Sequence, residues 1–537
     1  MDIPSLFMIP SAVSSGKVHS VFPNSTDADF DFNRDSDATR VNSEGLIERV
    51  GYYGSEEITN GSFDTDSNWV KGTGWSIANG KASNDGSQSG TSEIYQTGVV
   101  VIGKTYKLVY NIVDYTSGTL RIRCGNTFDV TNNAIGTYTA FLTATSNAGV
   151  GIQASADFIG SIDNVSVKEV TGDRARLNYE IEGGLVNTKP SLLLEPQSTN
   201  LVTYSEDFSQ WDNNGSTDTS NATTSPSGQI TADKITKLGN SGNDRVTLTS
   251  ITVSNSTSYA ISAFVKNDTN VTGGVTTLAF RVSGGTLFRR GYEWGANGLS
   301  FATTQASGTR TNEILEDYGN GWYRVGFSFT TNGTSGNFEV DIDRVNGTNT
   351  TSIFVWGAML EQQSYATSYI PTNGSTQTRA AETCNGAGTS SILPSEEGIL
   401  YAEIARPVND SVIRSIALSD GSAGNVVLIQ YYNNNIGIVV KVSSSAQAVF
   451  SISNTTLDFN KIAISWKSNS YKAFVNGTQT NTDTSGSTFS AGTLSEFAFD
   501  RGDGGEDFYG KIRDIRVYNT KEMTDSEVDI LLTKITS

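Results

Sequence analysis

The sequence has very few of the residues on which redox, metal and histidine-dependent chemistry rest. Among 537 residues it contains one histidine, His19, and two cysteines, Cys124 and Cys384. Cysteines this few and this far apart predict free, buried thiols rather than a disulfide framework. A histidine-rich metal site is excluded within one chain, and so is a catalytic triad unless it uses His19 itself. We interpret His19 as a structural residue.

Positive charge is scarce as well. Lys and Arg together number 37 against 56 Asp and Glu, which gives a formal net charge of −19. The average field of this surface would repel a polyanion, so we exclude nucleic acid as a partner. An acidic, polar surface rich in Asp and Asn suits neutral sugars or calcium.

Long apolar runs are absent. No stretch approaches the ~20 consecutive apolar residues that a membrane-spanning helix needs. The N-terminal stretch MDIPSLFMIPSAVSSGKV has neither a basic start nor a sustained apolar run, so it does not resemble a secretory signal. We therefore expect synthesis in a cytoplasm and no insertion into a membrane.

Long helical patterns are also missing, and short strand-like runs take their place. β-branched and aromatic runs alternate with turns rich in Gly, Asn, Ser and Asp, a pattern typical of β-sandwiches. Tyr106, Leu108, Tyr110 and Ile112 alternate with less apolar neighbours, as in a half-buried strand. A chain this long exceeds what one core serves, so we predict an all-β protein with several sandwiches.

An internal repeat is present. EITNGSFDTDSNW, residues 57–69, and VTYSEDFSQW, residues 202–211, both place acids and a Phe ahead of a Trp. Each copy closes with a similar strand, FIGSIDNVSVKEV at 158–170 and SIFVWGAMLEQQ at 352–363. Both copies resemble family 4/9 carbohydrate-binding modules. The resemblance implies two jelly-roll β-sandwiches that bind glycans.

The last part of the chain predicts a third sandwich and a short helix. GILYAEIA, KIAISWK and YKAFVNGT have strand patterns, and Asn476-Gly477 is a hairpin-turn signal. Thr524 and Glu527 form a capping box at the start of a C-terminal helix. The order FVNGT, GKIRDIRVYN, MTDSEV resembles the concanavalin A-like, laminin-G-like lectin sandwich.

One further segment is split by the first module. FNRDSDATRVNSEGLIERV at 32–50, RARLNYE at 174–180 and PSLLLEPQSTNL at 190–201 together resemble a segment of structural proteins of tailed bacteriophages. The first module separates its halves, which predicts a domain inserted at a surface loop. TQTRAAE at 376–382 is a candidate for the last piece of this split segment. The segment is either a linker that packs sandwiches together or a virion docking piece, and the two roles are compatible.

The predicted organisation therefore has five parts, with three jelly-roll or concanavalin A-like sandwiches in tandem. They are an N-terminal docking or linker segment (1–52), the inserted first module (53–172), the continuation of the segment (173–201), the second module with its closing linker (202–389) and the lectin-like sandwich (390–537).

Sugar binding needs exposed aromatic rings that stack on pyranose faces, and polar groups that bond the hydroxyls. For any single aromatic, the alternative is a place in the core. The run RRGYEWGANG, residues 289–298, has no clear core periodicity, so we interpret it as a polar loop. The candidates are Trp75, Tyr95, Tyr115 and Arg121 in the first module, Arg290, Tyr292 and Trp294 in the second, and Tyr431, Tyr432 and Asn433 in the lectin-like sandwich.

Related carbohydrate-binding modules hold Ca²⁺ between their first and last strands. The resemblance implies a structural calcium at Glu57 or Asn60 with Asp163, and it makes Glu206 and Glu361 the analogous acids of the second module. Hard oxygen ligands at two strand ends would fasten the sandwich. The alternative is that these carboxylates accept backbone N–H bonds. We expect no organic cofactor.

Two motifs suggest other chemistry. In FEVDIDRV, Glu339, Asp341 and Asp343 share one strand face, as paired-carboxylate catalysis requires. The motif departs from the Glu-x-Asp-x-x-Glu strand of concanavalin A-like glucanases in its last acid, and it lies in the second module. We interpret it as a solvated strand face. The RGD triplet at 501–503 lies in a glycine-rich loop without EF-hand spacing, and we interpret it as coincidental.

Together these patterns predict a non-enzymatic bacteriophage virion protein, a tail-fibre or head-fibre subunit on the virion surface that binds host-surface glycans for attachment. Its partners would be host glycans and other virion proteins. Copies would form a homo-oligomer such as a trimer, because several weak sites together give avidity. The alternatives are a capsid decoration or tail adaptor that contacts proteins, and a polysaccharide depolymerase.

Overall fold

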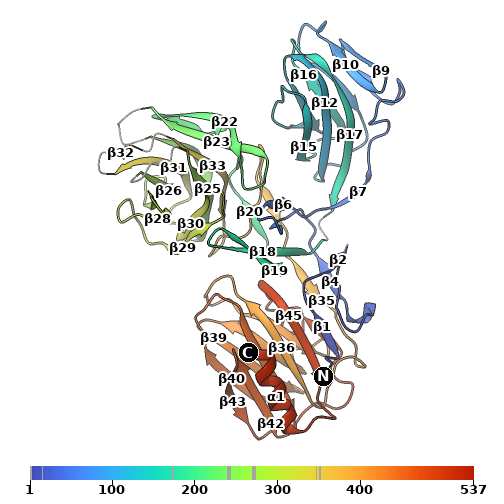
Figure 1. Cartoon of the computed structure of the whole chain (residues 1–537), viewed down its shortest axis with the longest axis vertical. Helices are drawn as coiled ribbons and strands as arrows, with labels where there is room; N and C mark the ends of the chain where they lie inside the picture. The colour runs from blue at the N-terminus through green and yellow to red at the C-terminus, as the bar shows by residue number, and fades with distance from the viewer. Residues whose placement is uncertain are drawn as a thin grey trace. The chain divides into compact units, whose positions relative to one another are not determined.

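The regular secondary structure of the protein is almost entirely antiparallel β-strand (Figure 1). The computed structural model describes residues 3–14, 16–171, 174–238, 244–268, 274–345, 348–349 and 352–537. Strands account for 55% of the structure and helices for 4%, which confirms the all-β prediction. Contacts divide the chain into two compact units: unit 1 combines residues 1–50 and 173–537, and unit 2 is residues 51–172.

Unit 2 is a two-sheet sandwich. One sheet has the order β15-β12-β17-β10-β9 with β7 paired to β17, and the other has the order β14-β13-β16-β11-β8. In β12, the predicted alternation buries Tyr106, Leu108, Tyr110 and Ile112 in the core between the sheets. The strands are β7 (Tyr52–Glu56), β8 (Val70–Lys71), β9 (Trp75–Ala78), β10 (Lys81–Asp85), β11 (Ser92–Gln96), β12 (Thr105–Ser117), β13 (Leu120–Cys124), β14 (Thr127–Phe128), β15 (Gly136–Thr143), β16 (Val150–Ala154) and β17 (Ile159–Thr171).

Unit 1 contains the second sandwich. Its sheets have the orders β21-β24-β31-β26-β27-β28, with β32 paired to β31, and β22-β23-β33-β25-β30-β29. Phe329 stacks against Phe280 and Phe288 in its core, with ring centroids 5.1 and 4.7 Å apart. The strands are β21 (Asp212–Asn214), β22 (Ser216–Thr224), β23 (Ile230–Lys237), β24 (Arg245–Thr252), β25 (Ser258–Asn267), β26 (Val275–Val282), β27 (Leu287–Gly295), β28 (Gly298–Phe301), β29 (Thr311–Asp317), β30 (Trp322–Thr330), β31 (Ser335–Val345), β32 (Thr348–Asn349) and β33 (Ser352–Glu361).

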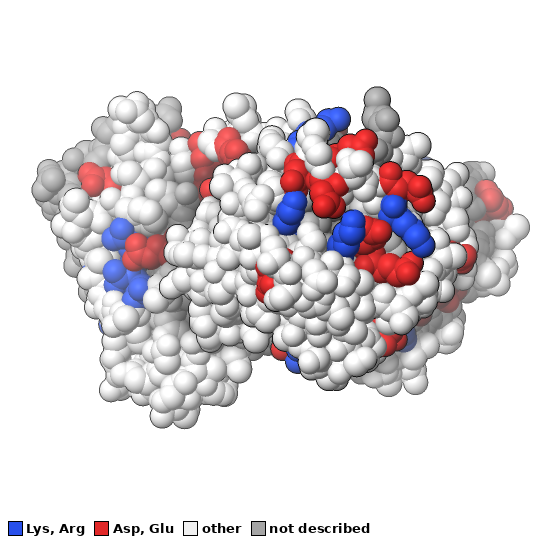
Figure 2. All heavy atoms as spheres, turned by 90° about the horizontal axis from the view of Figure 1, so that it is seen from below, with Lys and Arg blue, Asp and Glu red and all other residues white. Residues whose placement is uncertain are grey.

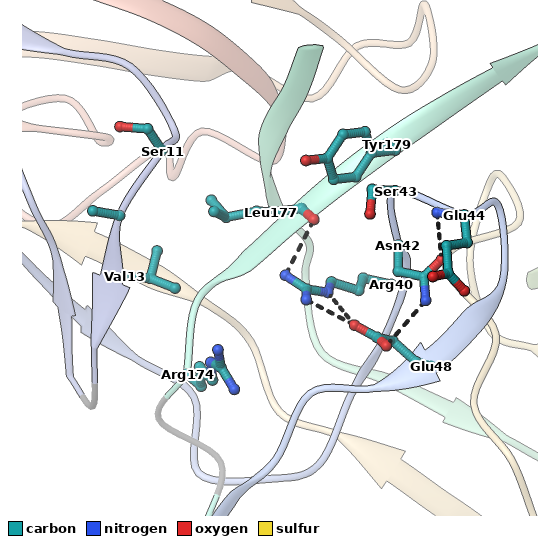
Figure 3. Close-up of a pocket in the computed structure, with 11 residues that line it drawn as sticks. Ser11, Val13, Arg40, Asn42, Ser43, Glu44, Glu48, Arg174, Leu177 and Tyr179 are labelled. Atoms are coloured by element: carbon teal, nitrogen blue, oxygen red, sulfur yellow. Dashed lines mark hydrogen bonds and ion pairs between the residues drawn. The ribbon is translucent and has the colours of Figure 1, made fainter. Parts of the chain in front are cut away.

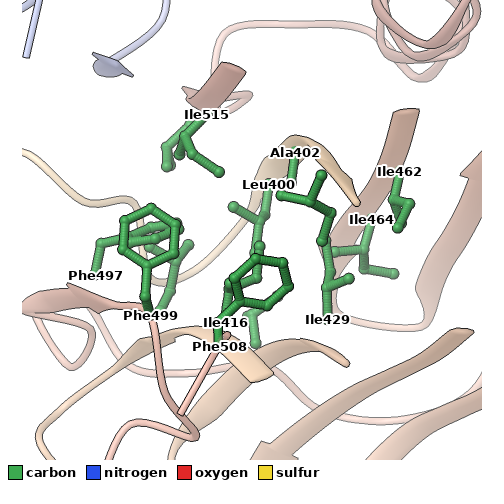
Figure 4. Close-up of a cluster of buried hydrophobic side chains, with 14 of the residues drawn as sticks. Leu400, Ala402, Ile416, Ile429, Ile462, Ile464, Phe497, Phe499, Phe508 and Ile515 are labelled. Carbon is green, nitrogen blue, oxygen red and sulfur yellow. The ribbon is translucent and has the colours of Figure 1, made fainter. Parts of the chain in front are cut away.

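Unit 1 also contains the third sandwich. Its sheets have the orders β40-β39-β38-β37-β44 and β18-β19-β45-β36-β41-β42-β43. Leu400, Ile429, Ile464 and Phe499 are among the apolar side chains that fill its core (Figure 4). The strands from the last part of the chain are β36 (Gly398–Ala405), β37 (Arg414–Ser419), β38 (Val426–Tyr432), β39 (Asn435–Val442), β40 (Ser445–Ser453), β41 (Asn460–Lys467), β42 (Ser470–Val475), β43 (Thr478–Asp483), β44 (Glu496–Ala498) and β45 (Gly510–Asn519).

The third sandwich includes three strands from earlier parts of the chain. β1 (Leu6–Met8) pairs with β45, with Leu6 opposite Val517. β19 (Leu185–Leu194) pairs with the other end of β45, and β18 (Arg176–Glu182) forms the next strand outward. The sequence patterns do not predict this extension. The segments interpreted as linker or docking pieces are thus partly strands of the last sheet.

The C-terminal helix α1 (Asp525–Thr536) forms as predicted. Thr524 N donates to Glu527 Oε2 at 2.7 Å, and Glu527 N donates to Thr524 Oγ1 at 3.4 Å, which confirms the capping box. Leu531 and Leu532 pack in a cluster with side chains of β36, β41 and β42. Within the described part of the chain, no helix has the length and apolar character to cross a membrane.

Both cysteines of the chain are free and buried, as predicted.

Short elements connect the sandwiches of unit 1. The connecting elements are β2 (Val13–Ser14), β3 (Lys17–Val18), β4 (Phe30–Asn33) and β35 (Thr383–Asn385) in one sheet, β5 (Thr39–Val41) with β6 (Ile47–Arg49), β20 (Ser198–Asn200) with β34 (Gln377–Arg379), and the 3-10 turns η1 (Thr26–Ala28) and η2 (Phe208–Gln210).

A buried ionic cluster joins four pieces of the split segment. This Arg–Glu cluster consists of Arg34, Arg176, Glu195, Arg379 and Glu382, and no side chain in it is more than 8% exposed. Glu382 accepts from Arg34 Nη1 at 2.7 Å and from Arg176 Nε at 2.8 Å. Glu195 Oε2 lies 2.8 Å from Arg176 Nη1 and 3.0 Å from Arg379 Nη1. TQTRAAE therefore meets the earlier segments through Arg379 and Glu382.

Candidate functional site

One sheet of unit 2 carries a row of polar and aromatic side chains on its outer face. Strand alternation turns Ile94, Ile122 and Ile152 inward, where they are fully buried. The neighbouring residues of β11, β13 and β16 point the other way. We name this surface the Tyr95 face, and its members are Glu93, Tyr95, Arg121, Arg123 and Gln153.

The strand register sets these side chains next to one another. Gly151 lies between Tyr95 and Arg123, and Gln153 lies between Glu93 and Arg121. A Cβ at Gly151 would lie 2.3 Å from Glu93 Oε1, so any larger residue would displace that carboxylate. The glycine keeps the centre of the Tyr95 face flat.

Ion pairs and cation–π contacts hold the polar groups in place. Arg123 pairs with Glu93, with Nη2 3.0 Å from Oε2, and its guanidinium lies 5.7 Å from the centroid of the Tyr95 ring. Arg121 donates to Gln153 Oε1 at 3.0 and 2.7 Å and covers the ring of Phe128 at 4.1 Å. Tyr95, Arg121 and Gln153 are half-buried, so part of each side chain is open to solvent.

This arrangement has the chemistry of a sugar-binding surface. An aromatic ring offers an apolar face to a pyranose, and fixed amide, carboxylate and guanidinium groups can bond its hydroxyls. Tyr95 and Arg121, two of the residues predicted from the sequence, lie on it together. The polar side chains are already fixed by their contacts with one another. Binding of a ligand would therefore cost little side-chain conformational entropy.

The other two residues predicted in the first module lie on the opposite sheet. Trp75 is only 6% exposed and sits in the core, with its ring centroid 6.4 Å from that of Phe158. Tyr115 is half-buried, and its hydroxyl donates to Gly118 O at 3.1 Å. Assigning Trp75 to a sugar platform is therefore wrong, because its ring is not accessible.

The predicted platform of the second module is part of a core strand. Arg290, Tyr292 and Trp294 belong to β27 and not to a loop. Tyr292 is fully buried and donates to Gly326 O at 3.0 Å, and Trp294 is 3% exposed and its Nε1 lies 2.9 Å from Thr276 Oγ1. Assigning these two rings to sugar binding is wrong for the same reason. Arg290 is half-buried and pairs with Glu313 at 3.2 Å.

In the third sandwich the predicted residues divide between core and surface. Tyr431 is 1% exposed and donates to Ile404 O at 3.1 Å, so the sugar assignment of this ring is wrong. Tyr432 points to the other side of β38, where it is half-exposed and its hydroxyl lies 2.8 Å from Ser451 Oγ. Asn433 is exposed at the following turn, with φ of 48°. Tyr432 and Asn433 stay accessible as a smaller candidate surface.

Two of the residues implied as calcium ligands in unit 2, Asn60 and Asp163, have other partners. The Asp163 carboxylate accepts from Asn164 N at 2.6 Å. The Asn60 amide donates to Thr65 O and Ser67 O at 2.6 and 2.9 Å and so holds its own loop. Nowhere in the described residues do three or more Asp, Glu, His or Cys side chains gather to hold a metal ion. These contacts do not form the cage of about six to eight oxygens that calcium takes.

Backbone pairing nevertheless brings the two predicted strand ends together. Val165 N donates to Gly61 O at 2.9 Å, and Glu57 N donates to Val167 O at 2.8 Å. Calcium at Glu57 or Asn60 with Asp163 stays a prediction. We expect EDTA to lower the Tm of the full chain relative to calcium, since an ion bound only by the folded state stabilises it. Calorimetry of the wild type and Asp163→Asn tests this, and equal wild-type curves would remove the site.

The two acids implied in the second module are bound by protein donors. Glu361 is fully buried and accepts from Thr367 N and Thr367 Oγ1, both at 2.7 Å. Glu206 accepts from Tyr369 OH at 2.9 Å. Burial raises the pKa of both carboxyls. Glu361 thus accepts a backbone N–H, as the alternative expected, whereas Glu206 accepts a side-chain hydroxyl, and calcium at this pair stays a prediction.

The first acid of the glucanase-like motif, Glu339, forms ion pairs with arginines. Glu339 is 2% exposed and bonds Arg281 Nε at 2.6 Å and Arg245 Nη1 at 3.3 Å. The expected solvated face is therefore buried and neutralised, while the side chain of Asp343 lies outside the described residues. In the RGD loop, Arg501 pairs with Asp503 and Glu506, each at 2.8 Å.

The split segment of unit 1 contains a cavity of about 670 Å³ (Figure 3). Arg40 lies along one side, 2.7 Å from Glu48, and donates to Leu177 O at 3.3 Å. The cavity is polar and open. Its lining consists of Ser11, Ala12, Val13, Arg40, Asn42, Ser43, Glu44, Glu48, Arg174, Leu177 and Tyr179.

Sequence reasoning missed Glu93, Arg123 and Gln153 of the Tyr95 face. A signal for them was present. The runs SEIYQ, LRIRC and GIQA each alternate an apolar residue with a polar or aromatic one, which places the second set on a single outer face. What no local pattern shows is that β11, β13 and β16 are neighbours in one sheet.

Comparison with known proteins finds one matching family and several similar solved structures, two of which are described here. Residues 404–529 match the family described as "Concanavalin A-like lectin/glucanases superfamily". The N-terminal CBM22-1–CBM22-2 tandem domain of Paenibacillus barcinonensis Xyn10C is 10% identical with a TM-score of 0.20, and it covers 58% of this chain and 98% of its own. The LG1-3 region of the laminin alpha2 chain is 8% identical with a TM-score of 0.13, covering 80% and 95%. These TM-scores are too low to carry an argument. No curated protein matches.

Proposed function

We propose that the chain is a glycan-binding structural protein of a bacteriophage virion, a tail-fibre or head-fibre subunit that attaches to host-surface glycans without a catalytic step. The Tyr95 face carries the binding part of this proposal. The match of residues 404–529 to a lectin-containing family supports it. The resemblance of residues 32–50 and 190–201 to phage structural segments supports the place on a virion.

Charge supports a neutral or weakly charged ligand. On the face that Figure 2 shows, acidic side chains lie beside Lys and Arg and no extended basic area is visible. A net charge of −19 would repel a polyanion. A single sugar contact is weak, so attachment would rest on several modules per chain and several chains per particle.

The Tyr95→Ala variant tests the binding surface. We expect it to weaken binding to susceptible cells by about 5- to 150-fold, which corresponds to about 1–3 kcal/mol for one anchoring ring. The Tm should stay within a few degrees of wild type because the ring lies on the outer face and is not part of the core between the sheets. Labelled protein on intact cells gives the affinity. Tyr115→Phe, on the opposite sheet, is the matched control and should bind like wild type. Unchanged affinity in Tyr95→Ala would exclude this face.

The cavity in the split segment favours a second candidate function, that of a capsid decoration or tail adaptor. A polar hollow of about 670 Å³ has room for a segment of another protein. A folded protein that ignores host cells, yet binds purified capsid or tail proteins stoichiometrically, would establish the adaptor role. Shortened host polysaccharide after incubation with the protein would instead establish a depolymerase.

A further inference from the structure

The only histidine of the chain lies between a serine and an aspartate. Ser14 Oγ is 2.9 Å from His19 Nε2, and His19 Nδ1 is 2.8 Å from Asp29 Oδ2. The second oxygen of the same carboxylate, Asp29 Oδ1, accepts from Ser20 N at 2.9 Å. These three side chains therefore form a continuous hydrogen-bonded chain in the small N-terminal sheet of unit 1.

The carboxylate selects the tautomer of the neutral ring. An ionised carboxylate can only accept, so His19 Nδ1 carries the proton that it donates to Asp29. In the neutral imidazole His19 Nε2 is then the acceptor, and Ser14 Oγ donates its proton to it. This is the tautomer in which a histidine acts as a general base toward a serine hydroxyl.

Solvent exposure increases from the acid to the serine, as a serine–histidine–acid site requires. The Asp29 side chain is 10% exposed, the His19 side chain is 38% exposed, and Ser14 is exposed. The orienting acid is thus shielded from water, whereas the hydroxyl is open to a substrate. Asp29 is held further because it is the C-cap of η1, with its N–H donating to Thr26 O.

Strand pairing adds a positive charge beside the serine. Ser14 on β2 lies directly opposite Lys17 on β3, so the two side chains share one face of the hairpin. Lys17 pairs in turn with Asp31 of β4. Because Asp31 partly neutralises this ammonium, it would give only weak support to the negative charge that forms on a carbonyl oxygen when a serine attacks it.

We propose that Ser14 is an acyl-transfer nucleophile, with His19 as its base and Asp29 as the positioning residue, and that the site removes ester-linked acyl groups. Ser14 Oγ would form a bond to the ester carbonyl carbon while His19 Nε2 takes its proton. The alcohol would then leave with that proton, and water would release the acyl group from Ser14 as the carboxylic acid. No oxidant, metal or cofactor is needed. This activity goes beyond the non-enzymatic attachment proposed above and does not depend on it. If it is found, the chain is an enzyme as well as a binding protein.

The surroundings indicate the kind of ester. The cavity of Figure 3 includes Val13 in its lining but not Ser14, which lies on the other face of the same strand. An exposed nucleophile without a deep pocket suits an acyl group that projects from a large molecule. O-acyl groups on a polymer have that geometry.

Covalent labelling tests the nucleophile. We expect a fluorophosphonate to modify the wild-type chain at Ser14, as located by peptide mass spectrometry, and to leave Ser14→Ala unmodified. Ser87→Ala removes an exposed serine of unit 2 and should be labelled like wild type. An adduct elsewhere, or equal labelling of Ser14→Ala, would overturn the proposal.

Ester hydrolysis tests the base and the positioning residue. With p-nitrophenyl acetate, we expect His19→Asn to lower the rate by about 10²- to 10⁴-fold, the usual contribution of a general base. Asp29→Asn, which keeps an acceptor for Ser20 N, should lower it as well because the amide no longer fixes the tautomer. Circular dichroism confirms folding, and exposure of Ser14 and His19 favours folded variants. Equal rates in wild type, Ser14→Ala and His19→Asn would show that the three side chains only hold the hairpin together.

Discussion

Replacing Glu382 by Gln is expected to destabilise unit 1 by about 3–5 kcal/mol, the usual cost of breaking a buried ion pair from one side. Glu382 accepts from Arg34 and Arg176, and all three side chains are fully buried. Without the carboxylate, the cluster would hold three guanidinium groups and a single acid in a place that water cannot reach. Denaturant unfolding followed by tryptophan fluorescence gives the change in free energy.

A surface pair provides the matched control. Glu396 pairs with Lys521 at 3.2 Å, with side chains 49% and 61% exposed. Glu396→Gln should change the free energy of unfolding by less than about 1 kcal/mol, as is usual for exposed pairs. If both variants unfolded at the same denaturant concentration, the Arg–Glu cluster would not be a main support of the fold.

The same cluster sets how this difference depends on pH. Burial alone would raise the pKa of Glu382, but Arg176 and Arg34 hold it below its ordinary value, and Arg379 and Arg176 do the same for Glu195. Carboxyls with a lowered folded-state pKa stabilise above their unfolded pKa of about 4.3, and that stability is lost as pH falls through the lowered values. The gap between wild type and Glu382→Gln should therefore stay constant from pH 8 to pH 5 and close only in stronger acid.

Trp294→Ala is expected to cost about 3–5 kcal/mol of stability and to leave cell binding unchanged. The ring is 3% exposed, lies 5.9 Å from the ring of Tyr323, and bonds Thr276 Oγ1 through its Nε1. Truncation would leave a cavity and remove the partner of a buried hydroxyl. Melting and cell binding, measured on the same sample below its Tm, separate the two effects.

Trp294→Phe serves as the milder comparison. It keeps most of the apolar volume and loses only the indole N–H, so it should be less destabilised than Trp294→Ala. A Trp294→Ala variant that melts like wild type and no longer binds cells would instead make this ring a binding residue.

Local periodicity was enough for some elements of the fold. Alternation located the strand from Tyr106 to Ile112, and the Thr524–Glu527 pair located the start of α1. Periodicity does not predict which strands pair. Leu6 and Leu192 both pair with residues of β45, and no local pattern around either leucine indicates that partner. Such pairings depend on which edges the finished sheet leaves open.

The site could be predicted only in part for a related reason. An aromatic residue in a strand points to the core or to solvent according to its register. Tyr431 and Tyr432 are adjacent, yet one is 1% exposed and the other half-exposed. The interpretation of residues 290–294 as a loop overlooks the strand spacing of Tyr292 and Trp294. Two residues apart in a strand, the two rings lie on the same face, and that face is buried. Ser14, His19 and Asp29 meet only through hairpin pairing and a 3-10 turn, which composition does not show.

The pairing of β1 with β45 has a consequence for the order of synthesis. Ser5 donates to Val517, a partner 512 residues later in the chain. At ribosomal rates of about 5–20 residues per second, β45 is made roughly 25–100 s after β1. Until then Leu6 and Met8, which are fully buried in the finished protein, belong to a strand without its partner. The nascent chain thus carries an unpaired strand edge for most of its translation, when aggregation competes with folding, and the last strand to be made covers the first.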